Sequence, residues 1–275
     1  MSIVVISDTL GSLGTEIGRR VAEARGYEFA DREIIEKAAE RFHEGIAELT
    51  HVTEEKPTLW ERFTDTRHRY MTYVEAIIYE MAARDDGVLV GRASAILLRG
   101  VAHALRVRIS APEDVRAERI QHEQGLTPDA ALDWVRQSDR ERASRVRFLY
   151  HVDWDDPLLY DLVLNSARLS APSGARLVDA ALDEERFRTT EASRGRLLDL
   201  GLTAQARAAL LANPTTRPYQ FLVSCKDGAV SLSGAVRSEE ERKVAEEVVG
   251  RIPGVAGVRG EIAVVNVKQG FARGL

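Results

Sequence analysis

The stretch "VVISDTLGSLGTEIGRRVAEARG", residues 4–26, decides how the first part of this 275-residue chain is interpreted. It runs from β-branched residues through glycines into residues 15–25, whose apolar positions recur at helical spacing. In a phosphate-binding loop of this layout, glycines let backbone N–H groups approach anionic oxygens, and the following helix N-terminus adds positive charge. We therefore expect a strand, a helix and, between them, a phosphate loop formed by Gly11, Ser12, Leu13, Gly14 and Thr15.

The loop lacks the lysine of the nucleoside-triphosphate pattern G-x-x-x-x-G-K-[ST], because no lysine follows any of its glycines. The spacing of Gly11, Gly14 and Gly18 also differs from the G-x-G-x-x-G of dinucleotide sites. On the loop alone, a nucleotide-phosphate site, a merely structural strand-helix turn and a dinucleotide site all stay open.

Composition and charge are those of an ordinary folded protein, with 44% apolar and 29% charged residues. The apolar runs are too short to span a bilayer, so we expect no membrane span. Residues 193–275 carry 12 Lys/Arg against 8 Asp/Glu, and residues 1–192 carry 26 against 35, so neither part has the basic stripe of a nucleic-acid-binding protein. The sequence shows no signal-peptide pattern and has one cysteine, Cys225, so we expect a cytoplasmic protein.

Strands and helices alternate over the first 190 residues. Short apolar runs such as residues 3–6, "ALRVRIS" (104–110) and "YDLVLNS" (160–166) predict strands, and residues 59–84, 113–123 and 127–150 are among the stretches that predict helices. This alternation predicts an α/β fold with a parallel sheet covered by helices on both faces.

The pattern changes after about residue 190. In "FLVSCKDGAVSLSGAV", residues 221–236, two β runs are joined at Asp227-Gly228, which is a hairpin signal. A helix over 238–250 and a third strand follow. We therefore expect two domains, residues 1–190 and a small α+β domain over residues 191–275.

Arginines are the candidate phosphate ligands outside the loop. Arg92 follows Gly91 at the exit of a strand, where α/β sheets bind ligands. A later helix carries a series of arginines, whose forked guanidinium groups suit phosphate oxygens, although a solvated face paired with nearby acids is the alternative. This series consists of Arg136, Arg140, Arg142, Arg145 and Arg147.

At these residues the chain resembles the cytidylate-kinase-like family of P-loop proteins, relatives of bacterial cytidylate kinase, over about residues 3–185. The family pattern is a strand, "SR", two variable residues and "GSGGxxIA", followed by "GYxFYDRExI", "VIVGRGA", "SDRERA" and "VDWDDPxLYDLVLNT". The resemblance implies a P-loop NTPase-type sheet and a bacterial protein. The corresponding stretches here are Ser7-Asp8, Gly11 to Gly18, Gly26 to Arg32, Val88 to Ala93, Ser138 to Ala143 and Val152 to Ser166.

The resemblance also implies roles for individual residues. Gly11 to Thr15 would hold the phosphates of ATP, bound with Mg²⁺. A lid would close over the transferring phosphoryl group, and its arginines would be the catalytic residues, namely Arg140, Arg142 and Arg145. The acceptor monophosphate would face Asp31, Arg32 and Arg92.

The sequence departs from the family pattern at three loop positions, with Asp8 for arginine, Leu13 for glycine and Gly18 for alanine. An aspartate adds repulsion near phosphates, and leucine limits how closely the backbone approaches an anion. The strand "VLV" also ends without the aspartate that organises magnesium in many P-loop enzymes. The metal ligands stay unknown, with Ser12, Thr15, Asp8 and the substrate itself as candidates.

The C-terminal part resembles a BON domain over residues 223–265, with Gly228, Gly234 and Gly254 at the turns. The resemblance implies ligand or phospholipid binding and protein association, with no catalytic constellation. Two functions follow from both resemblances. One is a nucleoside monophosphate kinase that transfers a phosphoryl group from ATP to CMP or dCMP. The other is a catalytically degenerate nucleotide sensor or scaffold, whose BON domain binds a ligand, a protein partner or a second copy of the chain.

Overall fold

The structure, a computed structural model, describes residues 2–54 and 65–265 and divides the chain into two compact units, residues 1–194 and 195–275. The boundary predicted after residue 190 stays a prediction. Within the described ranges, no helix is both long enough and apolar enough to cross a membrane.

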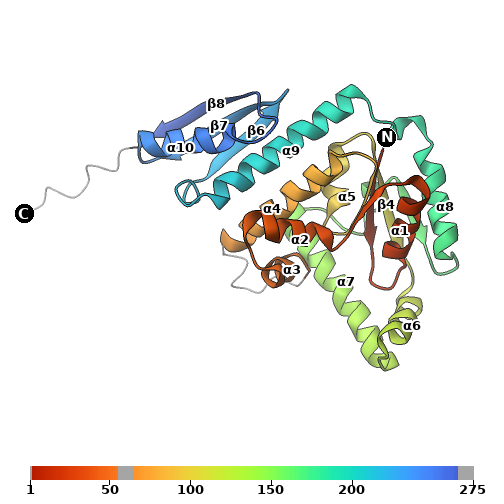
Figure 1. Cartoon of the computed structure of the whole chain (residues 1–275). Helices are drawn as coiled ribbons and strands as arrows, with labels where there is room; N and C mark the ends of the chain where they lie inside the picture. Colours follow the sequence, from red (N-terminus) through yellow and green to blue (C-terminus); the bar gives the residue numbers. More distant parts are fainter. Residues whose placement is uncertain (1, 55–64, 266–275) are drawn as a thin grey trace, which may run out of the picture. The chain divides into compact units, whose positions relative to one another are not determined.

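The first unit is built on a five-stranded parallel sheet with the strand order β2-β3-β1-β4-β5 (Figure 1). Its middle strand β1 is fully buried over residues 3–6, which explains the continuous apolar run in the sequence. In the register between β1 and β4, Ser7 lies beside Arg108. The strands are β1 (Ile3–Asp8), β2 (Glu28–Ala30), β3 (Gly87–Val90), β4 (Ala104–Ser110) and β5 (Leu162–Asn165).

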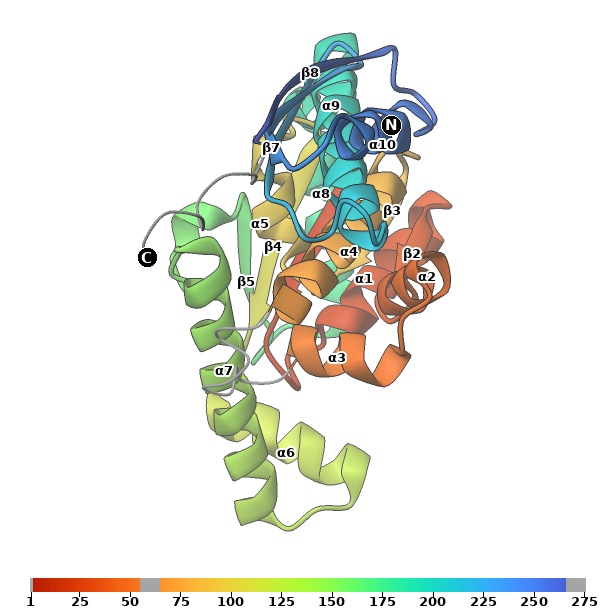
Figure 2. The ribbon, with the colours of Figure 1, turned by 90° about the vertical axis from the view of Figure 1, so that its left-hand side faces the viewer.

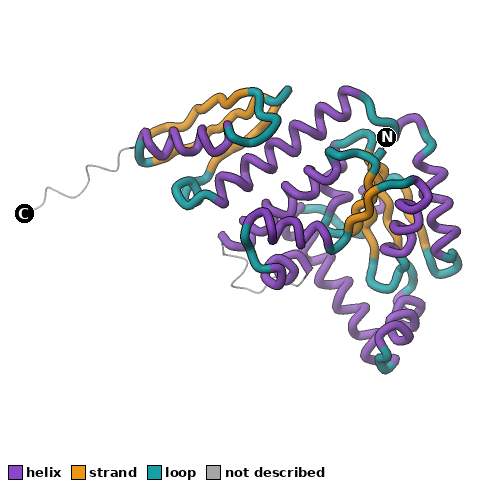
Figure 3. The backbone as a smooth tube through the Cα atoms, in the orientation of Figure 1, coloured by secondary structure: helices purple, strands orange, loops and turns teal. Residues whose placement is uncertain are grey.

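Helices cover both faces of this sheet, as Figure 3 shows for the first unit. Helices α1 and α8 share one core with the strands, in which Ile17, Val21 and Val178 are fully buried. Helices α4 and α5 contact β3 and β1, respectively. The helices of this unit are α1 (Gly14–Arg25), α2 (Glu33–Phe42), α3 (Ile46–Glu54), α4 (Asp65–Ala82), α5 (Ser94–Leu97), α6 (Glu113–Gln124), α7 (Pro128–Tyr150) and α8 (Ala171–Leu182), with 3-10 turns at η2 (Leu98–Gly100), η3 (Pro157–Leu159) and η4 (Glu185–Phe187).

The predicted parallel α/β architecture is confirmed. Helix α7 begins as expected, because the Thr127 side chain accepts a hydrogen bond from Ala130 N and Pro128 occupies the first turn. Figure 2 shows α6 and α7 extending together beyond the carboxyl ends of the strands. The first part of the helix expected over residues 59–84 lies outside the described residues. Elements that the sequence interpretation missed are β2, α3, α5 and α8.

The second unit has the predicted order of helix, two strands, helix and strand. Its sheet has the order β6-β7-β8, antiparallel between the first pair and parallel between the second. Asp227 and Gly228 form the two-residue hairpin turn with φ of 52° and 76°, the left-handed conformation that such turns require. The elements are α9 (Glu191–Ala212), β6 (Phe221–Lys226), β7 (Ala229–Val236), α10 (Glu239–Gly250) and β8 (Gly257–Val264).

Candidate active site

The loop after β1 is fastened to the ends of β4 and β5. Thr9 N donates to Ile109 O at 3.1 Å, and the Ser12 hydroxyl donates to the same carbonyl at 3.0 Å. The Ser166 hydroxyl, just after β5, donates to Ser12 O at 2.7 Å. Because Ser12 is fully buried and its hydroxyl bonds inward, this side chain holds the shape of the loop and does not face a ligand.

Two loop residues adopt the left-handed conformation, Gly11 with φ 77° and Leu13 with φ 66°. Leu13 begins α1 without a side-chain cap, and the first hydrogen bond of the helix runs from Ile17 N to Leu13 O. The N–H groups of residues 14–16 precede that bond and therefore lie at the open, electropositive end of α1. A leucine in this conformation costs about 1–2 kcal/mol, and its side chain packs against the core. The loop thus keeps the geometry of an anion-binding turn despite the substitution.

Asp8 fills the space beside Gly14. A Cβ atom placed on Gly14 would lie 2.3 Å from the Asp8 Cβ and 2.6 Å from its Oδ2. When Thr15 is matched to the last position of G-x-x-x-x-G-K-[ST], Gly14 takes the lysine position and Asp8 the first glycine position. The loop therefore carries a carboxylate next to the point where the pattern has a lysine.

Arginines from α6 and α7 surround the loop. Arg142 Nη1 donates to Asp8 O at 2.8 Å and lies 3.6 Å from Asp8 Oδ1. Arg119 donates to Gly11 O at 3.0 Å and to Ser166 O at 2.7 Å. The sequence interpretation named Arg142 and missed Arg119.

Arg116 fixes α6 against the loop and against α7. Its side chain, 3% exposed as a residue, donates to Ala111 O at 2.7 Å and to Leu10 O at 3.3 Å. It also forms a two-pronged ion pair with Asp139 on α7, with distances of 3.1 and 2.7 Å. Together, the two-pronged ion pair and the bonds to Ala111 O and Leu10 O tie α6 to α7 and to the loop. This arginine was not predicted either.

A third unpredicted arginine, Arg108 on β4, lies beside Ser7 at the start of the loop. It donates to the Ser7 hydroxyl at 3.1 Å and to Asp155 at 2.9 Å, and its guanidinium stacks 3.7 Å above the Trp154 ring. Burial lowers the pKa of Arg108, and neighbouring acidic groups such as Asp155 partly oppose that shift. The "VDWDD" motif is therefore tied to the end of β1 through a buried cation.

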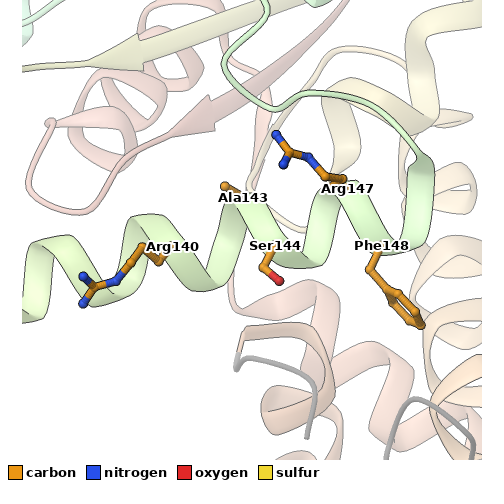
Figure 4. Close-up of a pocket in the computed structure, with 5 residues that line it drawn as sticks. All are labelled: Arg140, Ala143, Ser144, Arg147 and Phe148. Atoms are coloured by element: carbon orange, nitrogen blue, oxygen red, sulfur yellow. The ribbon is translucent and has the colours of Figure 1, made fainter. Parts of the chain in front are cut away.

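The three predicted catalytic arginines do not converge. Arg142 contacts the loop, and Arg145 is 7% exposed near Tyr150, whose pKa is raised by burial. Arg140 and Arg142 are two positions apart, which places them roughly 200° apart around a helix. Arg140 is exposed, and Figure 4 shows it beside a shallow pocket along α7 that is lined by Arg140, Ala143, Ser144, Arg147 and Phe148.

The predicted acceptor residues lie at the carboxyl ends of β2 and β3. The Thr15 hydroxyl donates to Asp31 Oδ2 at 3.4 Å, which brings Asp31 to the start of α1. Arg32 is exposed and precedes α2 directly. Arg92 is partly buried in a left-handed turn with Gly91 and Ala93, where φ is 75°, 54° and 59° along the turn. The structure thus brings Asp31 to the loop and places Arg92 in the turn after β3, the strand next to β1.

The charge of the Asp8 carboxyl depends on its neighbours. Burial raises the pKa of Asp8, Arg142 and Arg108 oppose that shift, and Asp31 adds to it. Within residues 2–54 and 65–265, no three or more acidic, His or Cys side chains are grouped as a metal site would need. A divalent cation here would therefore be coordinated partly by phosphate oxygens of the nucleotide, as Mg²⁺ commonly is.

Two residues at the end of the last core motif are structural. Arg106 donates from its backbone N and its Nε to Asp161 Oδ2, both at 2.9 Å, and from Nη2 to Oδ1 at 2.7 Å. Asn165 accepts a hydrogen bond from Ala167 N. These bonds fix the edge strand β5 and the turn after it.

A parallel sheet in this order, a loop between β1 and an uncapped α1, and a helical pair that brings arginines to that loop define a P-loop kinase fold. Residues 3–168 match the cytidylate kinase-like family, and residues 199–266 match the BON domain. The chain belongs to the cytidylate kinase-like family and carries a C-terminal BON domain.

Individual relatives agree with this assignment. The chain is 29% identical over 191 residues to the cytidylate kinase of Methanopyrus kandleri, which covers 66% of this chain and 93% of that protein. It is 30% identical over 177 residues to the cytidylate kinase of Natronomonas pharaonis, covering 64% and 86%. A crystal structure of an uncharacterized protein from Eubacterium ventriosum shares the fold with a TM-score of 0.54 at 16% identity, covering 67% of this chain and all of that one.

Proposed function

We propose that this protein is a nucleoside monophosphate kinase that transfers a phosphoryl group from ATP to CMP or dCMP. The observation that carries the proposal is the contact of arginines from α6 and α7 with the loop, in which Arg119 donates to Gly11 O and Arg142 donates to Asp8 O. Phosphoryl transfer needs positioned cations more than it needs covalent chemistry, so arginines held at an anion-binding turn suit it. The relatives named above are cytidylate kinases, which supports CMP as the acceptor.

In this proposal the loop residues Gly11 to Thr15 hold the ATP phosphates. The N–H groups at the start of α1 would face the phosphate oxygens, and the buried Ser12 would keep the loop in shape. The lid arginines Arg140, Arg142 and Arg145 would act during transfer, with Arg142 already at the loop. Asp31, Arg32 and Arg92 would bind the acceptor.

Mg²⁺ fits this arrangement as a partner of the nucleotide. When bound, it neutralises charge on the transferring phosphate group. The candidate protein ligands are Thr15 and Asp31, whose side-chain oxygens lie 3.4 Å apart, and Asp8, whose pKa is raised in part by the charge of Asp31. Carboxylate and hydroxyl oxygens are the donors that Mg²⁺ prefers.

The test is a transfer assay on the purified full-length chain with Mg-ATP and CMP, dCMP, UMP or AMP. We expect ADP and the nucleoside diphosphate in equal amounts with CMP and dCMP, measured by anion-exchange chromatography. We expect Arg142→Ala to lower the rate by ~10²-fold or more, because it removes a positioned charge from the transition state. Arg136→Ala is the matched control, since Arg136 lies on the same helix but pairs with Glu113.

A chain that forms no nucleoside diphosphate with any of the four acceptors contradicts the proposal. The second candidate, a nucleotide sensor, is favoured by the Asp8 carboxylate beside Gly14, which repels phosphate. Its signature is a rise in melting temperature with ATP and no transfer. In that case the BON domain would bind a ligand or mediate oligomerisation, and light scattering with and without ATP would measure the latter.

A further inference from the structure

The phosphate loop has no cation of its own. Between residues 7 and 18 the charged residues are Asp8 and Glu16, both acidic. A loop that binds a triphosphate needs positive charge beyond its backbone N–H groups, and the usual source is the lysine of G-x-x-x-x-G-K-[ST]. In this chain Gly14 stands at that lysine position, and the side chain of Asp8 fills the space beside it.

A cation that contacts Asp8 comes from α7. Arg142 lies 134 residues further along the chain, yet its Nη1 reaches both the carbonyl and the carboxylate of Asp8, at 2.8 and 3.6 Å. The Arg142 side chain is 33% exposed and that of Asp8 is 16% exposed. Since Nη1 makes both contacts and a third of the side chain stays open to solvent, the guanidinium can meet a ligand without leaving Asp8.

We propose that Asp8 is a positioning residue, which holds Arg142 at the loop so that the lid arginine takes the place of the missing loop lysine. The inference rests on the proposed function for its ligand, a nucleoside triphosphate. Asp8 and Arg142 act as one unit, in which the carboxylate anchors the arginine and the arginine neutralises the carboxylate. The phosphate groups then meet the exposed part of the Arg142 guanidinium and the N–H groups at the start of α1.

The surroundings of Asp8 support an anchoring role. The carboxyl is pressed against Gly14 and lies among Arg142, Arg108 and Asp31, and burial by itself disfavours its charge. Of the two arginines, Arg108 is itself buried and donates to Ser7 and Asp155, so it cannot turn to a ligand without leaving these partners. Arg142 is therefore the arginine of this group that can serve both Asp8 and a phosphate.

The same geometry suggests a rescue experiment. If Arg142 supplies the loop cation only because Asp8 holds it there, a cation placed at position 8 makes Arg142 dispensable. The family pattern carries arginine at this position, so the variant Asp8→Arg tests this directly. A second route is Asp8→Gly combined with Gly14→Lys, which clears the space beside residue 14 and returns a lysine to it.

The readout is the dissociation constant of ATP and of inorganic tripolyphosphate, measured by titration calorimetry on the full chain. We expect Arg142→Ala to weaken binding about 10-fold or more, as loss of one charge-assisted hydrogen bond does. We expect Asp8→Arg/Arg142→Ala, and Asp8→Gly/Gly14→Lys/Arg142→Ala, to bind within about threefold of the native chain. Arg136→Ala, the charge-matched control, should leave binding unchanged.

The inference is overturned if both rescue variants, folded by circular dichroism, bind as weakly as Arg142→Ala. It is also overturned if Arg142→Ala binds like the native chain, or if the native chain binds neither probe. The transfer assay separates this outcome from failure of the proposed function. If ATP binding follows the rescue pattern but no phosphoryl group is transferred, the role of Asp8 stands and the kinase function is wrong. If the chain transfers phosphate but neither rescue variant restores ATP binding, the kinase function stands and the role of Asp8 is wrong.

Discussion

Two aspartates, one in each unit, face opposite environments. Asp8 in the phosphate loop is anchored by an arginine from a distant helix, and burial raises its pKa. Asp199 on α9 accepts hydrogen bonds from Asp227 N and Gly228 N, both at 3.0 Å, and from the Cys225 thiol at 3.3 Å. Burial opposes the charge of Asp199 too, but these hydrogen bonds, that from Gly228 first, lower its pKa overall.

The difference separates a structural carboxylate from one that we propose acts together with a bound ligand. The Asp199 charge is satisfied by backbone N–H groups of the BON hairpin, and that arrangement is complete within the domain. Burial disfavours the charge of Asp8, and Arg142 on α7 and the neighbouring Asp31 act on it in opposite directions, so we expect a ligand that engages Arg142 to change it. Each of the following predictions tests one side of this contrast.

The largest effect is expected for Gly14→Ala. The new methyl group would meet Asp8 at 2.3 Å, so either the loop or the Asp8–Arg142 pair must move. We expect ATP binding to fall by at least about 10-fold and the free energy of unfolding to fall by about 1–3 kcal/mol, as overpacking does. Calorimetry and urea unfolding measure the two.

The matched controls for Gly14→Ala are a second glycine and a compensating change. Gly195→Ala, in α9 with open space around the added atom, should leave ATP binding unchanged. Asp8→Gly/Gly14→Ala should regain most of the lost stability, because it removes the atoms that the methyl group meets. Equal binding by Gly14→Ala and the native chain would show that Asp8 and Gly14 do not share this space.

An effect on stability alone, without loss of ATP binding, is expected for Asp199→Ala, which leaves the hairpin N–H groups without their acceptor. The loss of hydrogen-bond partners of this kind lowers the free energy of unfolding by about 1–3 kcal/mol. Amide hydrogen exchange at Asp227 and Gly228 should speed up, while ATP binding stays at the native value. Asp199→Asn keeps one acceptor oxygen, so its amide exchange rates should lie between those of the native chain and those of Asp199→Ala. Unchanged exchange at both amides would refute the structural role of Asp199.

The smallest effects concern pH. Because the pKa of Asp8 is raised, its contribution to stability is most favourable below its ordinary value of 3.8 and declines as the pH rises through the folded-state pKa. Asp199, with a lowered pKa, contributes stability above 3.8 and loses it as the pH falls through its folded-state pKa. At pH 7 we therefore expect Asp8→Asn to be no less stable than the native chain and Asp199→Asn to be less stable.

Carbon-13 titration of the side-chain carboxyls measures the two midpoints directly. The expected result is a midpoint above 3.8 for Asp8 and below 3.8 for Asp199. A midpoint below 3.8 for Asp8 and above 3.8 for Asp199 would contradict the contrast between the two aspartates.

Much of the fold could be predicted because local signals and long-range packing agree. The buried β1, the capped α7 and the Asp227-Gly228 hairpin all carry their own sequence signatures. Strand β2 has three residues and depends on pairing with β3, so no periodicity reveals it. Helix α8 follows Ser170, whose side chain caps it, and that signal was available but overlooked.

The candidate site was harder to predict because its contacts cross the chain. Arg116 and Arg119 lie in a helix rich in charged residues, where arginines usually face solvent, and only the fold shows that they reach Leu10 and Gly11. Arg108 gave a clearer signal, since a charged residue inside an apolar strand must find a partner. Helical periodicity could also have separated Arg140 from Arg142.

A crystal structure of the full chain with a non-hydrolysable ATP analogue would show directly whether Asp8 holds Arg142 at the bound phosphates. We expect phosphate oxygens within hydrogen-bond distance of the N–H groups of Gly14 and Thr15, with the Arg142 guanidinium bound to a phosphate while it still contacts Asp8. A nucleotide whose phosphates lie away from the start of α1, or an Arg142 that is turned away from both Asp8 and the phosphates, would contradict it.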